Sequence, residues 1–418
     1  MSAAARVTSS TIKGPVSYAT KTVLLRSSTL CLRLHVLPGI FSINTASKFN
    51  NSNSKVLAMS NFFSTSATTS IQEDQNHYTI AITGSTGLIG TALIDELSTN
   101  GKKINGKLPR IVPLIRKKKD DDESINNNSV SEWNPYPISN GEDSKVGYAF
   151  PPESLNNIDA VVHLAGENIA TGTGPLGFLG IRPWSDEKKA SIVDSRVIPS
   201  HAIANAIREC ETPTTFIGAS GIGVYGCDFI GEDATIADED SDTLNTKGFL
   251  AHISRVWESA QNKAENDKNT NRIVNLRFGV VLSKLGGALA KLYPVFFLGG
   301  GGNVGTGKQY FSFISARDVA RAIVHTLETP SLKGPVNVCS PNPCTNAEFT
   351  SAMGKVMRRP TILPLPEFAV KLAFGEMGEE MLLGGNRVYP KKLLESGFDF
   401  KHSTIESALQ SAIHEESI

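Results

Sequence analysis

The residues that follow Tyr78 have the types and spacing needed to hold a dinucleotide. A short apolar strand, Tyr78–Thr83, is expected to lead through glycines at positions 84, 87 and 90 directly into a helix. The first glycine permits a tight turn, the second lets backbone amides approach a diphosphate, and the third lets the helix pack closely on the strand. The positive end of the helix would face the phosphates. We predict that the phosphates of the dinucleotide bind at Gly84, Ser85, Thr86, Gly87, Leu88, Ile89 and Gly90. The alternative is that this segment is a plain strand-to-helix turn.

The second expected strand, Arg110–Ile115, indicates which dinucleotide is bound. In dinucleotide folds the end of this strand meets the adenosine ribose, where a carboxylate binds a free 2′-hydroxyl and an arginine binds a 2′-phosphate. Here the strand runs into Arg116, and no carboxylate stands at the corner. A guanidinium can contact phosphate through two hydrogen bonds, so the sequence predicts NADP(H). The alternative is that Arg116 only opens a solvated run of charges.

Small residues follow the expected strand Asp159–Leu164. Cofactors in open parallel sheets lie at the carboxyl ends of the strands, and small side chains let them approach closely. We therefore add Leu164, Ala165, Gly166, Glu167 and Asn168 to the cofactor site. His163 has no metal-ligand neighbours at suitable spacing, and no metal site is expected.

The elements that position these residues alternate between strand-like and helical patterns. Further strands are expected at Thr214–Ala219 and Arg272–Leu276, with no tight hairpin signal between them. This predicts an α/β fold with a doubly wound parallel (Rossmann) sheet, although Pro113 weakens the second strand. We place the dinucleotide-binding domain at 77–340 and a smaller module on the substrate side at 341–418. Insertions near 117–152 and 171–181 interrupt the domain, the first a surface loop and the second either a lid or a packed loop.

Composition excludes several classes of protein. The chain has 418 residues, 40% hydrophobic and 20% charged, as in ordinary globular proteins. Its net charge is zero, but residues 1–72 hold seven Lys and Arg and no Asp or Glu, which leaves 34 Lys and Arg against 41 Asp and Glu elsewhere. The body is therefore acidic and lacks a field for nucleic acid. The five cysteines form no Cys-x-x-Cys pair and suit a reducing compartment.

Residues 1–76 have the composition of an organelle transit peptide. They are rich in Ser and Thr and poor in acids, so we exclude them from the fold; a disordered tail without an address is the alternative. Arg6, Arg26 and Arg33 favour a mitochondrion slightly over a plastid. Arg26 and Arg33 also interrupt the apolar stretch near residue 30, and no transmembrane helix is expected anywhere.

Together these segments resemble the extended short-chain dehydrogenase/reductase superfamily, and more closely its atypical "epimerase family" branch. The resemblance runs from Tyr78 to Ile413, and the two insertions depart from the compact form of that branch. It is carried by Ile82-Thr-Gly-Ser-Thr-Gly-Leu-Ile-Gly90, His163-Leu-Ala-Gly-Glu-Asn168, Trp184-Ser-Asp-Glu-Lys188, Leu276-Arg-Phe-Gly-Val-Val-Leu282, Gly305-Thr-Gly-Lys-Gln309, Asn342-Pro-Cys-Thr-Asn-Ala-Glu-Phe349 and Gly384-Gly-Asn-Arg-Val-Tyr-Pro-Lys391.

The resemblance implies a catalytic Ser or Thr after the fifth strand and a Tyr-x-x-x-Lys on the next helix. Ser220 matches the first element, but the tyrosine and lysine positions fall on Leu250 and Ser254. Two hypotheses remain. In one, the protein is an NADP(H)-dependent oxidoreductase or epimerase-like enzyme of unknown substrate, in which Ser220 orients the substrate and Tyr225 gives the proton.

In the other hypothesis, the protein binds NADP(H) without transforming anything, as a sensor or a partner in organelle division. Ser220 could then simply bond to backbone, and Tyr225 could be a packed aromatic. Arg277 could meet an anionic small-molecule substrate or pair with an acid within the sheet. Protein partners are not readable from the sequence.

Overall fold

The computed structural model describes two compact units, Met1–Ser70 and Ile71–Ile418. The residues it describes are 6–11, 19–27, 30–37, 40–43, 76–99, 101–116, 132–138, 147–149, 155–169, 183–231, 233–266 and 270–414. In the first unit they form an antiparallel sheet of β1 (Arg6–Thr11), β2 (Ala19–Ser27), β3 (Leu30–Leu37) and β4 (Ile40–Ile43). We predicted that residues 1–76 are a leader outside the fold, and this targeting role stays a prediction.

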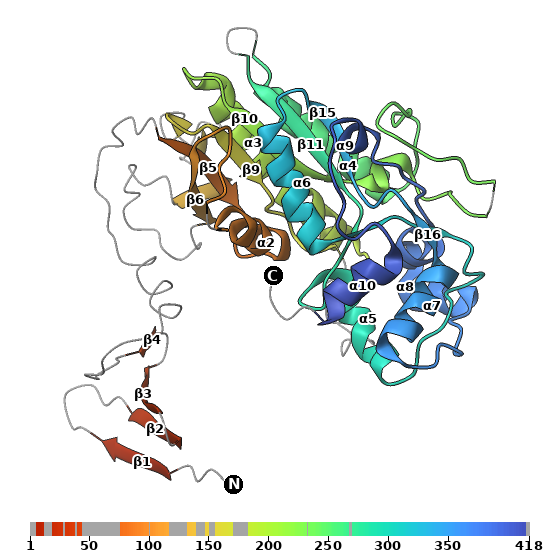
Figure 1. Ribbon diagram of the computed structural model, residues 1–418, viewed down its shortest axis with the longest axis horizontal. Coiled ribbons are helices and arrows are strands. Elements are labelled where there is room, and N and C mark those ends of the chain that lie inside the picture. Colours follow the sequence, from red (N-terminus) through yellow and green to blue (C-terminus); the bar gives the residue numbers. More distant parts are fainter. Residues whose placement is uncertain are drawn as a thin grey trace. The chain divides into compact units, whose positions relative to one another are not determined.

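The second unit is built on a doubly wound sheet, which confirms the predicted α/β fold (Figure 1). Its order is β15-β11-β10-β9-β5-β6-β7-β8, and every neighbouring pair is parallel except β7 and β8. The strands are β5 (His77–Thr83), β6 (Leu108–Arg116), β7 (Glu132–Ile138), β8 (Gly147–Ala149), β9 (Ala160–His163), β10 (Thr215–Gly221), β11 (Arg272–Phe278) and β15 (Gly334–Val338). The chain reverses its winding between β5 and β9, which makes their carboxyl ends the expected ligand crevice.

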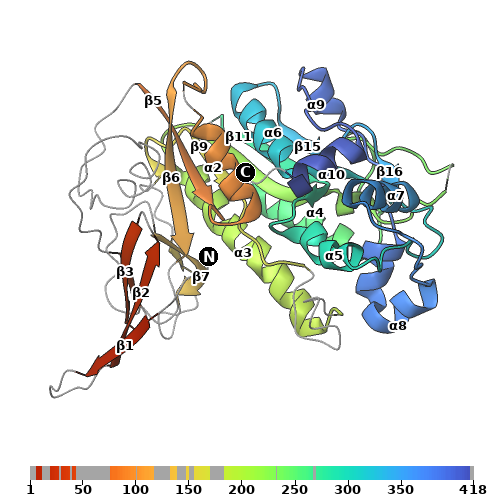
Figure 2. The same ribbon diagram turned by 60° about the horizontal axis from the view of Figure 1, so that its bottom comes forward.

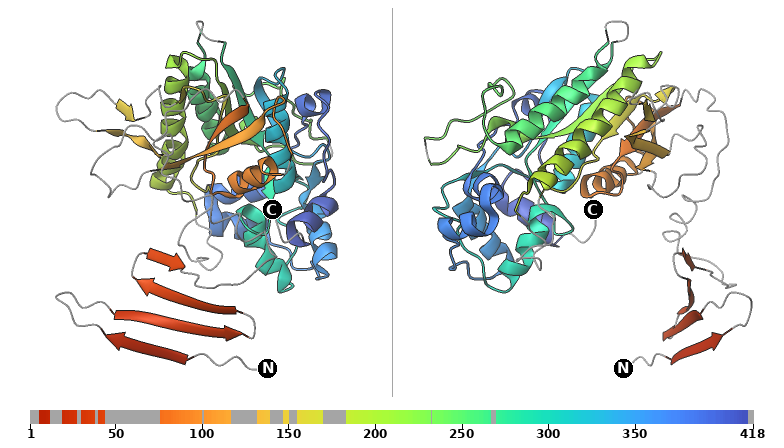
Figure 3. Two further views of the ribbon diagram at one scale, coloured as in Figure 1. Left: turned by 60° about the vertical axis from the view of Figure 1, so that its left-hand side comes forward. Right: turned by 180° about the vertical axis from the view of Figure 1, so that it is seen from behind.

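Helices cover both faces of this sheet. On one face, α2 (Leu88–Leu97) and α6 (Ala316–Glu328) pack their apolar sides on β5 and β11. On the other face lie α3 (Asp186–Glu209) and α4 (Phe249–Gln261), which run side by side (Figure 3). Alternate residues of β5 point to the two layers: Ile80 and Ile82 join the first core and Ala81 joins the second. Burial on both faces explains why these strands read as continuous apolar runs.

Three strands of the sheet were not predicted. β7 and β8 lie within 117–152, where we predicted a surface loop, so that prediction is wrong for these residues; the stretch is polar and Pro135 and Pro137 weaken its strand pattern. The last parallel strand, β15, was not predicted, because Gly334-Pro-Val-Asn-Val338 is short and begins with two strand-weakening residues. The second strand, β6, is formed in spite of Pro113. A proline is tolerated there because β6 pairs with β7 only at Ile115 and Arg116, so the outer edge of β6 has no described partner at Pro113.

Several of the remaining elements form a lobe beside the carboxyl ends of the strands. Its core contains α5 (Gly287–Phe297), α7 (Asn346–Met357) and α10 (Ile405–His414). The predicted capping box of Thr345 and Glu348 is present at the start of α7. The other elements are η3 (Ile222–Tyr225), η4 (Asn262–Ala264), β12 (Val280–Leu282), β13 (Tyr310–Phe311), β14 (Phe313–Ser315), β16 (Cys344–Thr345), α8 (Glu367–Gly378), the π-helical turn η5 (Glu379–Leu383) and α9 (Lys391–Glu395).

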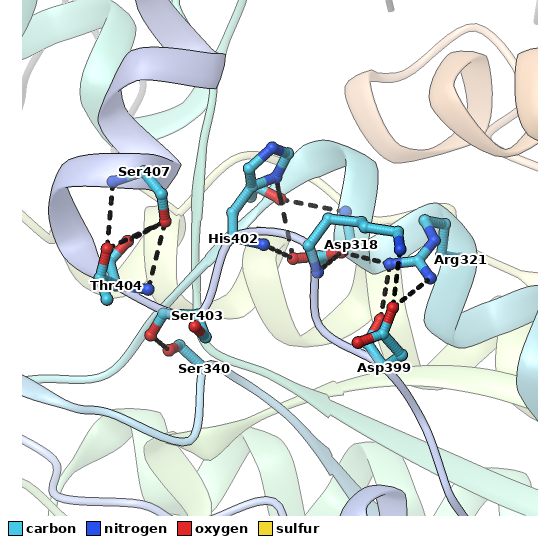
Figure 4. A network of polar contacts seen from close by, with 10 residues as sticks. Asp318, Arg321, Ser340, Asp399, His402, Ser403, Thr404 and Ser407 are labelled. Carbon is cyan, nitrogen blue, oxygen red and sulfur yellow. Dashed lines mark hydrogen bonds and ion pairs between the residues drawn. The ribbon is translucent and has the colours of Figure 1, made fainter.

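Residues 385–402 form hydrogen bonds with residues of this unit that lie far away in the sequence. Gly385 donates its N–H to the Cys227 carbonyl at 2.8 Å. The Ser312 hydroxyl donates to the Asn386 carbonyl at 2.8 Å and accepts the Val388 N–H at 3.0 Å. Further on, Asp318 in the first turn of α6 accepts the backbone N–H groups of Lys401 and His402 at 3.0 and 2.8 Å (Figure 4). Residues 385–402 thus pack as part of this unit. Within the described residues, no helix combines the length and apolarity that crossing a bilayer requires.

Candidate functional site

The turn between β5 and α2 has the geometry that its three glycines predict. Gly84 adopts φ +68°, and the Gly87 N–H donates to the Gly84 carbonyl at 3.0 Å. A Cβ at Gly84 would lie 2.9 Å from the Leu164 carbonyl carbon, and one at Gly90 would lie 2.2 Å from the Gly84 oxygen. The turn is therefore closed against both the start of α2 and the end of β9, and neither glycine has room for a side chain.

The amino end of α2 is open to an anion. Its N-cap, Gly87, supplies no capping side chain, and its first turn carries no acidic residue. Unsatisfied N–H groups and the helix dipole thus point out of the turn. Ser85 is buried, Thr86 and Gly87 are exposed, and Leu88 and Ile89 are half-buried. This arrangement fits the diphosphate of a dinucleotide, with the backbone of residues 84–90 as the cradle.

A buried hydrogen-bond network joins the ends of β5 and β9. The Thr83 hydroxyl lies 2.6 Å from His163 Nδ1 and accepts the N–H groups of Leu164 and Ala165 at 3.2 and 3.3 Å. His163 is fully buried, and burial lowers its pKa to about 3. The imidazole is therefore neutral at physiological pH, and it holds the two strand ends in register at the crevice.

This neutral histidine predicts a pH dependence of stability. The unfolded imidazole takes a proton near pH 6.5, whereas the folded one does so only near pH 3, so stability is lost as pH falls through that window. The loss attributable to His163 is of the order of 5 kcal/mol. Denaturant unfolding at several pH values gives the free energy of unfolding as a function of pH. The slope of this dependence should be shallower for His163→Asn than for the wild type. Equal slopes would exclude His163 as the titrating group.

The loop after β9 is fastened to α3. The Glu167 carboxylate forms an ion pair with Lys188 and accepts from Ser191, and the Arg196 guanidinium donates to the Glu167 carbonyl at 2.9 Å. Burial opposes ionisation of Glu167, but these hydrogen bonds and the charges of Lys188 and Arg196 outweigh it and lower its pKa. Trp184 donates its indole N–H to the Ile169 carbonyl at 3.0 Å. Of the five residues predicted here, Leu164 and Ala165 lie against Gly84 of the glycine turn, and Gly166 and Glu167 lie against α3.

Arg116 ends β6, one strand away from the glycine turn. Its backbone pairs with Trp133 of β7. Its side chain lies outside the described residues, so its proposed contact with a 2′-phosphate stays a prediction.

A second polar cluster lies where β10 and β11 end. The Ser220 hydroxyl donates to Glu258 Oε1 at 2.8 Å, and Arg277 donates to both oxygens of the same carboxylate, each at 2.8 Å. The Glu258 and Arg277 side chains are 12% and 5% exposed. Arg277 thus pairs with an acid, but this acid comes from helix α4 and not from the sheet, as one of our two alternatives had it. Burial opposes the charge of this guanidinium, but Glu258 more than offsets it and raises the pKa of Arg277.

Tyr225 belongs to the same cluster through two hydrogen bonds of its phenol. Its phenol accepts from Arg277 Nη1 and donates to Asn337 Oδ1, both at 2.9 Å. The residue is 4% exposed, and burial raises its pKa to about 12 in spite of the neighbouring Arg277. These contacts favour a positioning role for Tyr225 over the proton-donor role expected from the sequence.

The helix α4 presents one continuous face to this cluster. Leu250, Ser254 and Glu258 follow one another at intervals of four residues, and a Cβ at Gly221 would lie 3.6 Å from the Ser254 hydroxyl. Ser254 itself donates to the Leu250 carbonyl at 2.9 Å. Leu250 and Ser254, which stand where the tyrosine and lysine were expected, therefore lie beside the end of β10. Glu258 was missed as a site residue, although its helical spacing from Leu250 and Ser254 could have revealed it.

Comparison with known proteins agrees with this geometry. Residues 80–339 match the model of the NAD-dependent epimerase/dehydratase family, and residues 365–412 match a domain of unknown function. An epimerase family protein of Mycobacterium tuberculosis is 38% identical over 79% of this chain and 96% of its own length. The Arabidopsis thaliana protein named epimerase family protein SDR39U1 homolog, chloroplastic, is 32% identical over 81% of this chain and 88% of its own.

A solved structure extends the comparison to three dimensions. The crystal structure of human epimerase family protein SDR39U1 (isoform 2) with NADPH superimposes with a TM-score of 0.63 at 28% identity. The match covers 80% of this chain and 98% of the human one. The chain therefore belongs to the NAD-dependent epimerase/dehydratase family, in the atypical extended short-chain dehydrogenase/reductase branch of SDR39U1.

Proposed function

We propose that this protein binds NADP(H), with the diphosphate on the backbone of residues 84–90. The observation that carries the proposal is the uncapped amino end of α2 behind a turn that is closed by Gly84 and Gly90. Residues 164–168 border the same crevice and would lie against the rest of the cofactor. The human relative solved with NADPH supports this choice of cofactor.

The proposed contact between Arg116 and the 2′-phosphate gives a direct test. Arg116→Asp should weaken NADPH binding about ten- to hundredfold, because it removes a charge-assisted hydrogen bond and adds a repelling charge. Binding of NADH, which lacks this phosphate, should change little. Titration calorimetry with both nucleotides measures the difference, and equal losses would remove the 2′-phosphate role from Arg116.

We further propose that the protein is an oxidoreductase or epimerase-like enzyme in which Ser220 touches the substrate. When bound, the cofactor supplies or accepts a hydride. The Ser220 proton is directed at Glu258, so the lone pairs of Ser220 Oγ are left to accept a hydrogen bond from a substrate hydroxyl. Arg277 donates to both oxygens of the Glu258 carboxylate, and Tyr225 accepts from Arg277 and so holds it in place. In this proposal Tyr225 is a positioning residue.

Turnover of a substrate panel tests the enzymatic proposal. Pure protein with NADPH or NADP⁺ is incubated with aldehydes, ketones, alcohols and nucleotide sugars, and the absorbance of the reduced cofactor is followed. Turnover by the wild type that Ser220→Ala loses about a hundredfold or more would support the role of Ser220. Undiminished turnover in Ser220→Ala would contradict it.

A second candidate function is a non-catalytic NADP(H) sensor or organelle-division partner. It is favoured by Leu250 and Ser254 at the two positions of the missing proton-transfer groups and by the burial of Tyr225. Tight cofactor binding without turnover across the panel would select this function.

We also propose that residues 1–76 contain an organelle leader. The chloroplastic Arabidopsis relative supports an organelle, whereas the slight preference for mitochondria has no support among the relatives. Imaging of a fluorescent protein fused to residues 1–76 would identify the compartment, and a diffuse cytosolic signal would contradict the leader.

A further inference from the structure

The guanidinium of Arg196, on α3, lies buried beneath the loop that follows β9. The residue is 6% exposed, and its Nη2 and Nη1 donate to the carbonyls of Glu167 and Ile192 at 2.9 and 3.0 Å. A Cβ on the exposed Gly166 would lie 3.5 Å from Arg196 Cζ. The guanidinium also lies over the Trp257 ring of α4, with Cζ 4.9 Å from the ring centroid. The cation is thus in contact with both the loop at the crevice and α4.

No described carboxylate contacts this guanidinium directly. Its acceptors are two carbonyls and the Ser195 hydroxyl, and within the described residues its Nε–H has no acceptor. The Glu167 carboxylate is engaged by Lys188 and Ser191 instead. Burial lowers the pKa of Arg196 to about 10, against the opposing charge of Glu167, so the side chain stays protonated at physiological pH. Arg196 and Lys188 against Glu167 leave one net positive charge beside the crevice.

The charge of Arg196 costs more than its hydrogen bonds require. Burying a charge without a contacting counter-charge opposes folding, whereas a neutral donor could hold the same carbonyls at a lower cost in desolvation. A buried charge with a perturbed pKa at the edge of a cleft is typical of a functional site. The charge itself, rather than the hydrogen bonds, is therefore the feature that needs a function.

The strand order indicates which half of a dinucleotide would lie above Arg196. This step rests on the proposed function, which puts the diphosphate at the end of β5 and the adenosine at Arg116 of β6. In the sheet, β6 lies on one side of β5, whereas β9 and β10 lie on the other. Figure 2 shows β6 towards the left of the sheet and β11 and β15 further right. A dinucleotide extends across the carboxyl ends of the strands, so its nicotinamide half would lie over β9 and β10. The loop that covers Arg196 follows β9 directly.

We propose that Arg196 is a specificity-determining residue that makes the crevice prefer NADPH to NADP⁺. The nicotinamide ring of NADP⁺ carries a positive charge, whereas the ring of NADPH is neutral, so the Arg196 cation repels only the oxidised form. Two like charges about 10 Å apart at a partly buried site change a binding constant roughly three- to tenfold. At the ends of β10 and β11, Glu258 and Arg277 pair with each other, so their charges largely cancel.

Binding of NADPH and NADP⁺ to the full chain, measured by titration calorimetry, tests this proposal. The wild type should bind NADPH about three- to tenfold more tightly than NADP⁺. In Arg196→Met, the ratio of the two dissociation constants should fall close to one, because the cation is gone. Arg196→Lys should keep most of the ratio, even where lost hydrogen bonds weaken binding of both nucleotides. If Arg196 merely held the loop in shape, Arg196→Met would lose affinity for both nucleotides equally.

Arg272→Met is the matched control for the loss of a carbonyl-bound guanidinium. Arg272 Nη1 donates to the carbonyls of Thr326, Thr329 and Leu332 at 2.9, 3.1 and 3.1 Å. Arg272 begins β11, however, and so lies at the opposite end of the sheet from the crevice. Its replacement should leave the ratio of the two dissociation constants as in the wild type, because repulsion falls with distance.

Glu167→Gln tests the same repulsion with the opposite sign. It removes the negative charge that opposes Arg196 and Lys188, so the preference for NADPH should rise about two- to fivefold. The Glu167 side chain is 33% exposed, so this variant tests the proposal even where Arg196→Met does not fold. An unchanged ratio in Arg196→Met or in Glu167→Gln would overturn the proposal, as would a wild type that binds NADP⁺ as tightly as NADPH. A wild type that binds neither nucleotide would contradict the proposed function, and this proposal with it.

Discussion

Replacing Gly90 by alanine is expected to reduce NADPH affinity by about ten- to hundredfold. The added Cβ would lie 2.2 Å from the Gly84 carbonyl oxygen and 2.7 Å from Ser85 Cα, so the turn between β5 and α2 must open. Opening moves the amides that cradle the diphosphate, and each tenfold loss corresponds to about 1.4 kcal/mol. Overpacking at this point should also cost about 1 to 3 kcal/mol of stability. Calorimetric titration and thermal unfolding measure the two effects separately.

Gly286 provides the matched control for this substitution. Its backbone is extended, and a Cβ there would lie no closer than 3.7 Å to Leu88, which is ordinary contact. Gly286→Ala should therefore keep both stability and cofactor affinity within about twofold of the wild type. If Gly90→Ala bound NADPH as well as Gly286→Ala does, the cradle would have to lie elsewhere.

Replacing Glu258 by alanine is expected to destabilise the protein by about 3 to 5 kcal/mol. The change strands the Arg277 guanidinium, whose side chain is 5% exposed, without the carboxylate that receives two of its hydrogen bonds. Removing one partner of a buried ion pair costs this much because the other charge stays buried and unpaired. Denaturant unfolding measures the loss.

A double variant distinguishes loss of the ion pair from loss of packing. Glu258→Leu combined with Arg277→Met removes both charges and keeps the volume, so it should recover most of the stability. It also leaves the Ser220 hydroxyl without its acceptor and therefore should not recover any turnover found for the wild type. A double variant as unstable as Glu258→Ala would show that the charges themselves are not the cause.

How well the sequence predicts a structural feature depends on how far apart along the chain the residues that determine it lie. The glycine turn is local: strand, three glycines and helix lie within about twenty consecutive residues, and all were predicted. The capping box of α7 is local as well. The strand β15 was missed because its propensities are weak and only its pairing with β11 makes it a strand.

The Ser220 cluster could be predicted only in part. Ser220 was singled out by the family resemblance and Arg277 because it follows an apolar strand, but the acid that joins them comes from the helix between β10 and β11. Which face of α4 meets the strand ends depends on tertiary packing. Burial of the Tyr225 phenol between Arg277 and Asn337 likewise depends on residues more than fifty positions away.

Residues 385–388 form hydrogen bonds with Cys227 and Ser312, and these contacts have a consequence for biosynthesis. During translation, the parallel strands of the sheet leave the ribosome before residues 385–388 do. Until these residues emerge, the Cys227 carbonyl and the Ser312 hydroxyl lack these partners and stay open to water. A nascent chain stalled before Gly384 should therefore remain protease-sensitive at those points.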